Sequence, residues 1–456
     1  MSSTTQARAR IDSLLDANSF VEIGAKVKAR ATDFNLKQTD TPSDGVVTGY
    51  GVIEGRLVYV YAQDPGVLGG SIGEMHAKKI AGLYDLALKT GAPIIGLIDS
   101  TGLRLEESTD ALNSFAQIYL KQSEASGVIP QITAVFGNCG GGLAIAGAMS
   151  DFVLVEASKG KLFVNSPNAI EGNNSGKCDT SAADFQSEAG NVDVSADEAE
   201  VYSQIRKLIE LLPSNNSDIA VDECDDDLNR GTSASGDVEA LVASIADNGT
   251  VFETRRGFTE DMYTALIRLG GATVGCIANK DQKMSAAGAA KAARFAEFCD
   301  AFDIPILTLT DVTGFKACKC GEKKLPANLA KLTFAFANAT VPKINVYTGK
   351  AFGSAYAAMN SKGLGADMCF AWPDAEIGCM EADAAAKILA SDKSADEIAK
   401  TASEYAALQN NVESAAARGY VDTIIEPVNT RKYLIGAFEM LATKAVEGPA
   451  KKHGTV

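Results

Sequence analysis

The sequence predicts an α/β protein built from two tandem copies of one domain. Three observations point to this fold class. Short apolar runs rich in β-branched residues alternate with amphipathic helical runs, one residue spacing recurs between the two halves of the chain, and clusters of small residues follow equivalent strands in both halves. Strands that alternate with helices are joined by crossover connections, which is typical of a parallel sheet covered by helices.

The composition bounds the size and the class of the protein. The chain has 456 residues, 46% of them hydrophobic, and is long enough for two or three domains. Lys and Arg total 42 against 58 Asp and Glu, a net charge of −16, which argues against nucleic acid and against an anionic membrane surface. No apolar run approaches the roughly 20 residues of a membrane helix, and the first residues lack the apolar core of a signal peptide. A cytoplasmic protein is therefore expected.

The internal repeat has one constant offset between its two copies. This offset holds over several segments and relates Pro, Gly and Asp positions at the ends of strands and in turns. Chance does not explain such a constant offset. A further segment, 55–64, resembles 271–281 only after a shift of a few residues. The matched pairs include Pro93 and Pro305, Asp99 and Asp311, Thr101 and Thr313, Gly102 and Gly314, Pro130 and Pro342, Gly137 and Gly349, and Gly141 and Gly353.

The elements of the first copy follow from periodicity and from their end signals. Residues 58–63, 93–99 and 132–137 are expected to be strands, and residues 71–91 an amphipathic helix that ends at Gly91. Between the copies the chain is polar and acidic, with one further helix at 198–212. We expect domains at 1–215 and 237–456, joined by an acidic linker at 216–236.

The clusters of small residues suggest chemistry performed by the main chain. Gly140, Gly141 and Gly142 follow one predicted strand, and Gly353, Ser354 and Ala355 follow its counterpart. A helix amino terminus stripped of side chains presents unpaired N–H groups to an anion, as an oxyanion hole does. Tight strand-to-helix packing is the alternative, although two equivalent clusters weaken it. A phosphate loop fits less well, because no Lys with Ser or Thr follows either cluster.

Few side chains are candidates for catalysis or for metal binding. Cys318 and Cys320 come nearest to metal-ligand spacing, but no partner pair lies nearby, so no metal is expected. His76 falls in a helical stretch and is interpreted as a surface or helix-packing residue, and the other histidine, His453, lies in a basic tail. Glu106 and Glu107 are interpreted as a solvated helix start. Without paired Glu residues near the glycines, a hydratase or isomerase that uses them as acid and base is disfavoured.

Several stretches together resemble the carboxyltransferase subunits of biotin-dependent acyl-CoA carboxylases and decarboxylases, a family that includes propionyl-CoA carboxylase β chains and methylmalonyl-CoA carboxyltransferase and decarboxylase chains. They cover most of the chain in the family's order. They include DGVVTGYGVIEGRLVYVYAQD, LGGSIGEMHAKKI, GAPIIGLIDSTGLRLEE, SGVIPQITAVFGNCGGG, DIPILTLTDVTGF, ATVPKINVYTGKAFGSAYAAM and FAWPDAEIGCM. The resemblance implies two crotonase-like domains, each a ββα superhelix.

The resemblance also implies a function. A carboxyl group would move between biotin and the α-carbon of a short acyl-CoA, through an enolate held by backbone oxyanion holes. Biotin would be on a separate carrier protein, since no Met-Lys-Met biotinylation motif occurs here. The expected partners are a biotin carboxyl carrier protein with either a biotin carboxylase or the subunits of a membrane decarboxylase pump. A homohexamer, a dimer of trimers with sites between subunits, is expected.

The site residues implied by the resemblance fall into two groups. Gly141 and Gly142 would hold the thioester oxygen, and Ser354 and Ala355 the ureido oxygen of biotin. The CoA thioester would bind against Gly69, Gly70, Ser71, Thr101 and Gly102, and the biotin side would include Gly314, Phe315, Gly353 and Tyr356.

Several segments depart from the family pattern. The text KACKCGEKKLPANLAKL at 316–332 replaces a Gly-rich segment and an Arg-His pair, and EAGNVDVS at 188–195 replaces a Ser-Gly-Val-x-His element. Lys280 and Asp281 stand where a Gln-Pro is usual, and Ala357 where an Asp is usual. An alternative is therefore a non-catalytic paralogue that is a structural or regulatory partner of an active subunit.

Overall fold

The computed structural model describes residues 5–32, 34, 40–233 and 237–446. The chain divides into two compact units. The first runs to Ile219 and also includes Arg255–Phe258, and the second comprises Ala220–Thr254 and the chain from Thr259 onward. His453 and its basic tail lie outside the described residues.

The first unit is built on a seven-stranded sheet in the order β1-β2-β3-β4-β5-β7-β9. The strands from β3 onward are parallel, while β1, β2 and β3 pair antiparallel. The parallel strands β4 and β5 are buried along their whole length, as apolar runs in a covered sheet should be. The strands are β1 (Val21–Ile23), β2 (Val46–Ile53), β3 (Arg56–Gln63), β4 (Ile94–Ile98), β5 (Gln131–Val135), β7 (Phe152–Glu156) and β9 (Val194–Ala196).

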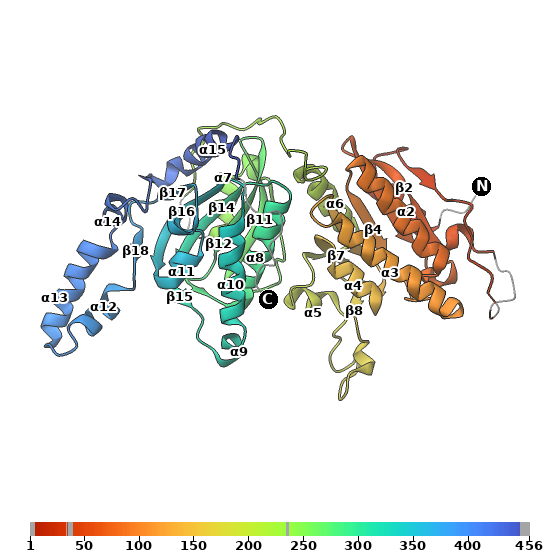
Figure 1. The fold of residues 1–456 in the computed structure, drawn as a ribbon, viewed down its shortest axis with the longest axis horizontal. Coiled ribbons are helices and arrows are strands. Elements are labelled where there is room, and N and C mark those ends of the chain that lie inside the picture. The colour runs from red at the N-terminus through yellow and green to blue at the C-terminus, as the bar shows by residue number, and fades with distance from the viewer. Residues whose placement is uncertain (1–4, 33, 35–39, 234–236, 447–456) are drawn as a thin grey trace. The chain divides into compact units, whose positions relative to one another are not determined.

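Helices pack against this sheet. In α2 (Glu74–Thr90) the residues Ile80, Leu83, Tyr84 and Ala87 are buried at helical spacing, and Gly91 ends the helix in the left-handed conformation with φ 63°. Figure 1 shows α2 beside α3 (Ser108–Ala125), with which it packs. The other helices of this unit are α1 (Gln6–Leu14), α4 (Gly142–Ala148), α5 (Ala183–Glu188) and α6 (Glu198–Leu211).

The second unit repeats the same strand order, β10-β11-β12-β14-β16-β17-β19. The strands are β10 (Val251–Glu253), β11 (Met262–Leu269), β12 (Ala272–Asn279), β14 (Ile306–Val312), β16 (Lys343–Phe352), β17 (Met368–Ala371) and β19 (Thr423–Ile424), and β18 (Glu376–Gly378) pairs with the end of β16. The helices are α7 (Val238–Ile245), α8 (Ala286–Ala301), α9 (Lys319–Glu322), α10 (Leu325–Asn338), α11 (Gly353–Ala358), α12 (Ala382–Leu389), α13 (Ala395–Tyr405), α14 (Val412–Ala417) and α15 (Thr430–Leu441).

The predicted repeat is confirmed by these bounds. Strands β4 and β14 begin at the predicted offset from each other, as do β5 and β16, whereas β2 and β11 begin slightly farther apart. The difference arises because the connection from β3 to α2, residues 64–73, is longer than the connection from β12 to α8, residues 280–285. The longer connection holds Gly69, Gly70 and Ser71, so the predicted CoA loop has no counterpart of equal length in the second unit.

The predicted linker is divided between the two units: residues 216–219 belong to the first, where the Asn216 amide donates to the Val128 carbonyl at 3.0 Å, and residues 220–233 belong to the second. Val221 forms a bridge with Ala272, and the Asp222 amide donates to the Gly271 carbonyl at 2.8 Å. Asp226 pairs with Arg230 at 2.8 Å. Residues 234–236 of the predicted linker lie outside the described residues.

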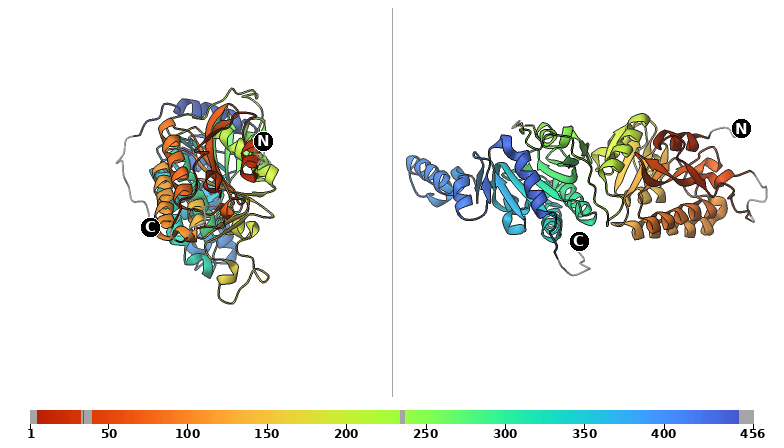
Figure 2. Two further views of the ribbon diagram at one scale, coloured as in Figure 1. Left: turned by 90° about the vertical axis from the view of Figure 1, so that its right-hand side faces the viewer. Right: turned by 90° about the horizontal axis from the view of Figure 1, so that it is seen from above.

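Two helices of the second unit, α12 and α13, pack on each other as a hairpin that extends away from the sheet of that unit (Figure 1 and Figure 2). Among the described residues, no helix has both the length and the apolar character needed to cross a membrane.

Candidate functional site

The carboxyl ends of β4 and β5 form the centre of the predicted acyl-CoA side. Asp99 follows β4 and lies against the backbone of Gly137, which follows β5. The Ser100 amide then donates to the Asn138 carbonyl at 3.0 Å. Loops after adjacent parallel strands meet at one edge of the sheet, where ligands of α/β proteins bind.

Part of the glycine cluster of the first unit lies in a strand. Asn138–Gly140 form the short strand β6, which pairs with β8 (Lys161–Phe163), and the Gly141 amide continues that ladder by donating to the Phe163 carbonyl at 2.9 Å. Gly141 has φ 60° and ψ −128°, a conformation that favours glycine, and α4 starts at the next residue. The Gly141 amide is therefore engaged by the protein.

Gly142 is the first residue of α4, so its amide has no acceptor within its own helix. Its carbonyl accepts from the Tyr119 hydroxyl at 2.7 Å, and a Cβ atom at position 142 would lie 2.7 Å from the same hydroxyl oxygen. Of the two predicted thioester donors, Gly142 is thus the one whose amide the helix leaves available.

The predicted CoA loop is assembled next to the end of β4. The Thr101 amide donates to the Gly69 carbonyl at 3.0 Å, and the Ile72 amide donates to the Gly102 carbonyl at 2.8 Å. A Cβ on Gly69 would lie 2.9 Å from Thr101 side-chain atoms, and one on Gly70 would lie 2.5 Å from the Asp99 carbonyl oxygen. Both glycines also have positive φ, so close packing and backbone conformation each require glycine there.

A buried ionic cluster supports this loop and was missed from the sequence. The guanidinium of Arg104 donates to the Ser71 carbonyl at 2.7 Å and to its hydroxyl at 3.1 Å, and pairs with Asp44 at 2.5 Å and Glu107 at 2.8 Å. Glu107 also accepts from the Glu74 amide. The interpretation of Glu107 as solvated is wrong, because it is buried as the partner of Arg104, whereas Glu106 is exposed. Sequence periodicity carries no signal for such a cluster.

His76 is buried in the same region. Its Nδ1 lies 2.9 Å from the Asp44 carbonyl oxygen and its Nε2 3.2 Å from Gln63 Nε2. Burial lowers the pKa of His76 to about 3, and burial raises the pKa of the Asp44 carboxyl. The imidazole is therefore neutral at physiological pH and fills a helix-packing role, while a surface position for it was wrong.

The second unit repeats the arrangement after β14 and β16. A Cβ on Gly349 would lie 2.7 Å from the Asp311 carboxylate, and the Lys350 amide donates to that carboxylate at 2.8 Å. Gly314 and Phe315 form the short strand β15, which pairs with β13 (Lys283–Met284) and contacts α11. Ser354 and Ala355 lie in the first turn of α11, Ser354 exposed and Ala355 buried.

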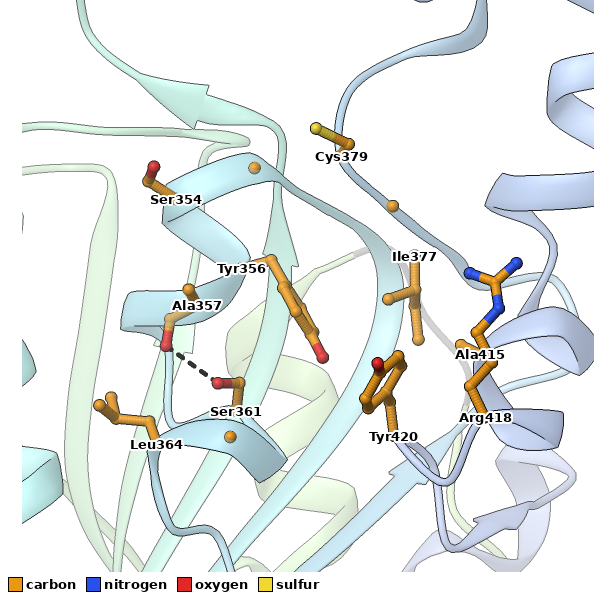
Figure 3. A pocket seen from close by; sticks show the side chains of 13 residues that line it. Ser354, Tyr356, Ala357, Ser361, Leu364, Ile377, Cys379, Ala415, Arg418 and Tyr420 are labelled. Carbon is orange, nitrogen blue, oxygen red and sulfur yellow. Dashed lines mark hydrogen bonds between the residues drawn. The ribbon is translucent and has the colours of Figure 1, made fainter.

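A pocket of about 680 Å³ opens beside α11 (Figure 3). Of the predicted biotin-side residues, Gly353, Ser354 and Tyr356 line it. Further lining residues, which the sequence did not suggest, come from β18, α14 and the turn after it, and include Ile377, Cys379, Arg418 and Tyr420. Figure 3 shows the side chains of Tyr356, Ile377 and Tyr420 grouped together, with Arg418 to the right of them.

One ion pair joins two of the segments that depart from the family pattern. Lys316 and Asp281, both in departing segments, pair with each other at 3.2 Å. Among the described residues, no group of three or more His, Cys, Asp or Glu side chains is placed to hold a metal ion.

The two similar sheets, each with a glycine turn at its carboxyl edge, define a duplicated α/β protein of the crotonase-like class. The family model described as carboxyl transferase domain matches residues 3–456. Methylmalonyl-CoA decarboxylase subunit alpha of Veillonella parvula is 40% identical, covering 99% of this chain and 92% of that protein. Propionyl-CoA carboxylase beta chain of Roseobacter denitrificans is 38% identical, covering 99% and 93%. The chain belongs to the carboxyl transferase domain family, as the resemblance predicted.

A solved structure agrees with this assignment. The chain is similar to the transcarboxylase 12S crystal structure with hydrolysed methylmalonyl-coenzyme A bound, with a TM-score of 0.94 and 36% identity over 98% of this chain and 92% of that one. The predicted fold of two crotonase-like domains is confirmed by this likeness.

Proposed function

We propose that this chain transfers a carboxyl group between biotin on a separate carrier protein and the α-carbon of a short acyl-CoA such as propionyl- or methylmalonyl-CoA. One observation carries the proposal. In both units the chain leaves a parallel strand, turns at a glycine with φ near 60° and begins a short helix, at Gly141 and at Gly353. Each turn offers main-chain amides for a developing negative charge.

On the acyl-CoA side, Gly142 would donate to the thioester oxygen. When the α-carbon loses a proton or a carboxyl group, negative charge develops on that oxygen, and a preorganised donor stabilises the transition state by about 3 to 4 kcal/mol. The Gly69–Ser71 loop, held by Thr101 and Arg104, would position the CoA thioester. No side-chain base is needed for this chemistry, which agrees with a buried His76 whose two ring nitrogens both contact protein atoms.

On the biotin side, the pocket beside α11 fits the biotin ring system. Its volume of about 680 Å³ lies within the ordinary range of ligand sites, and Tyr356, Tyr420 and Ile377 provide apolar walls. Biotin, when bound, would supply the carboxyl group and a ureido nitrogen that accepts the α proton. Ser354 and Ala355 would donate their amides to the ureido oxygen and so hold the ring in one orientation.

Partners follow from the same proposal. The biotin of a carrier protein would enter the pocket, and either a biotin carboxylase would load its carboxyl group or membrane decarboxylase subunits would remove it. The transcarboxylase 12S structure is described as a hexamer assembly. We propose a hexamer for this chain as well, arranged as two stacked trimers.

An exchange assay tests the function. Purified protein is incubated with methylmalonyl-CoA or malonyl-CoA and free biotin, and loss of the carboxyl group from the thioester is followed by chromatography. Turnover that requires biotin is expected. Absence of turnover with every thioester and with a carrier protein, while the CoA thioester still binds, would contradict the proposal and favour a non-catalytic paralogue.

A further inference from the structure

Two cysteines of the second unit lie unusually close together. Cys318 and Cys320 are separated by a single residue at the start of α9, and their Sγ atoms are 3.3 Å apart. Both side chains are exposed and neither is in a disulfide. By contrast, Cys139, Cys276, Cys299 and Cys369 are buried, which protects them from oxidants in solution.

We propose that Cys318 and Cys320 form a redox-active dithiol that closes reversibly to an intrachain disulfide. A disulfide bond is about 2.04 Å long, so the two sulfurs need to approach by on the order of 1 Å. The pair lies at the start of a single short helix at the surface, and the side chains there can rotate without displacing a core. Exposed disulfides of this kind are the readily reduced ones.

The local environment favours a thiolate at Cys318. The Gly321 amide donates to Cys318 Sγ at 3.2 Å, and the hydrogen bond from Cys320, followed by that from Gly321, lowers the pKa of the Cys318 thiol. The charge of Glu322 acts in the opposite direction, but the pKa is lowered overall. A lower pKa favours the thiolate, which is the nucleophile in exchange reactions. Cys318 is therefore the attacking residue and Cys320 the resolving one.

The reaction balances with a small disulfide, such as oxidised glutathione, as the oxidant. The Cys318 thiolate attacks one sulfur of the small disulfide, whose S–S bond breaks, and one thiolate of the reagent leaves. Cys320, as a thiolate, then attacks the Cys318 sulfur and expels the second thiolate of the reagent. The protein loses two electrons, the small disulfide gains them, and the two protons of the cysteine thiols end on the two released small thiols.

A metal site at the same residues is less well supported. A structural zinc ion needs four ligands, and within the described ranges no group of three or more potential ligands comes together. A redox pair, unlike a zinc site, needs only two thiols that are exposed and close together.

Trypsin provides a direct test, because it cleaves after Lys319, between the two cysteines. The full-length reduced protein is incubated with oxidised glutathione, free thiols are blocked with N-ethylmaleimide, and the peptides are examined by mass spectrometry without reduction. We expect the peptides carrying Cys318 and Cys320 to be joined by a disulfide, or, if the ring blocks cleavage, one peptide lighter by two hydrogen atoms. Dithiothreitol should restore both thiols.

Two variants make the test specific. Cys320→Ser should stop at a stable glutathione adduct on Cys318, because the resolving thiol is missing. Cys379→Ser removes another exposed cysteine and should form the 318–320 disulfide as the unmodified protein does. The proposal is overturned if both cysteines of the unmodified protein carry separate glutathione adducts, if both remain alkylatable, or if either one pairs with another cysteine or another chain.

Discussion

The backbone of Gly137 lies directly against the carboxylate of Asp99, so that a Cβ atom at position 137 would overlap Asp99 Oδ1. The carboxylate also pairs with the buried guanidinium of Arg10 at 3.0 Å, which limits its freedom to move aside. Gly349 and Asp311 repeat the relationship in the second unit. In each unit this contact joins the loops that follow two neighbouring strands. The proposed acyl-CoA site starts from these loops in the first unit, and the proposed biotin site from those in the second.

Gly137→Ala should therefore destabilise the first unit. Overpacking of this kind costs about 1 to 3 kcal/mol, so the midpoint of thermal unfolding should fall by several degrees in calorimetry. Gly82→Ala is the matched control, because Gly82 lies within α2 with nothing within 4 Å of an added Cβ. Alanine there favours the helix and should leave the midpoint unchanged or higher. Equal behaviour of the two variants would contradict the importance of the contact.

Gly142→Pro should reduce kcat by about 10² to 10³ if the Gly142 amide holds the thioester oxygen. Proline is accepted at the first helical position, where it removes the N–H without breaking a hydrogen bond of the helix. Gly142→Ala adds a Cβ at the same place but keeps the N–H, and should lose much less activity. Both are best compared in a Tyr119→Phe background, because an added Cβ would otherwise lie 2.7 Å from the Tyr119 hydroxyl. If alanine and proline are equally harmful, packing and not the amide is responsible.

Stability should decrease as the pH falls from about 6.5 toward 3, in part because of His76. Its pKa is about 3 in the folded chain and 6.5 at its ordinary value, so in this window the unfolded chain binds a proton that the folded chain does not. This contributes up to about 1.4 kcal/mol per pH unit. His76→Gln, whose side chain does not titrate, should show a smaller loss of unfolding temperature between pH 7 and pH 5. An unchanged pH dependence would show that His76 contributes nothing to it.

Ala357→Phe should block the pocket beside α11. Ala357 lines that pocket and its side chain is exposed, so a phenyl ring would occupy the space without entering the core. We expect the KM for free biotin to rise at least tenfold, which corresponds to about 1.4 kcal/mol of binding energy, while the affinity for CoA thioester is unchanged. Ala399→Phe, on the exposed side of α13, is the control. A normal KM for biotin in Ala357→Phe would place biotin elsewhere.

The sequence by itself determined the architecture. The alternation of strands and helices, the end of α2 at Gly91, and the constant offset between the two copies were all readable, because apolar periodicity and glycine conformations are local properties of the chain. The duplicated glycine clusters could be located for the same reason. The resemblance of whole segments then identified the family.

Only the tertiary structure decided how individual groups are used. The Gly141 amide proved to be engaged by Phe163, which belongs to the separate strand β8, so the two neighbouring glycines are not equivalent. Glu107 is buried where its carboxylate accepts from the Glu74 amide, and the pocket gains Arg418 and Tyr420 from a segment that lies far beyond α11 in the chain. Such contacts join residues that are distant in the chain. Their energies depend on burial and on whether neighbouring groups already satisfy each donor and acceptor. Local periodicity contains none of that information, because it is created only when the strands assemble.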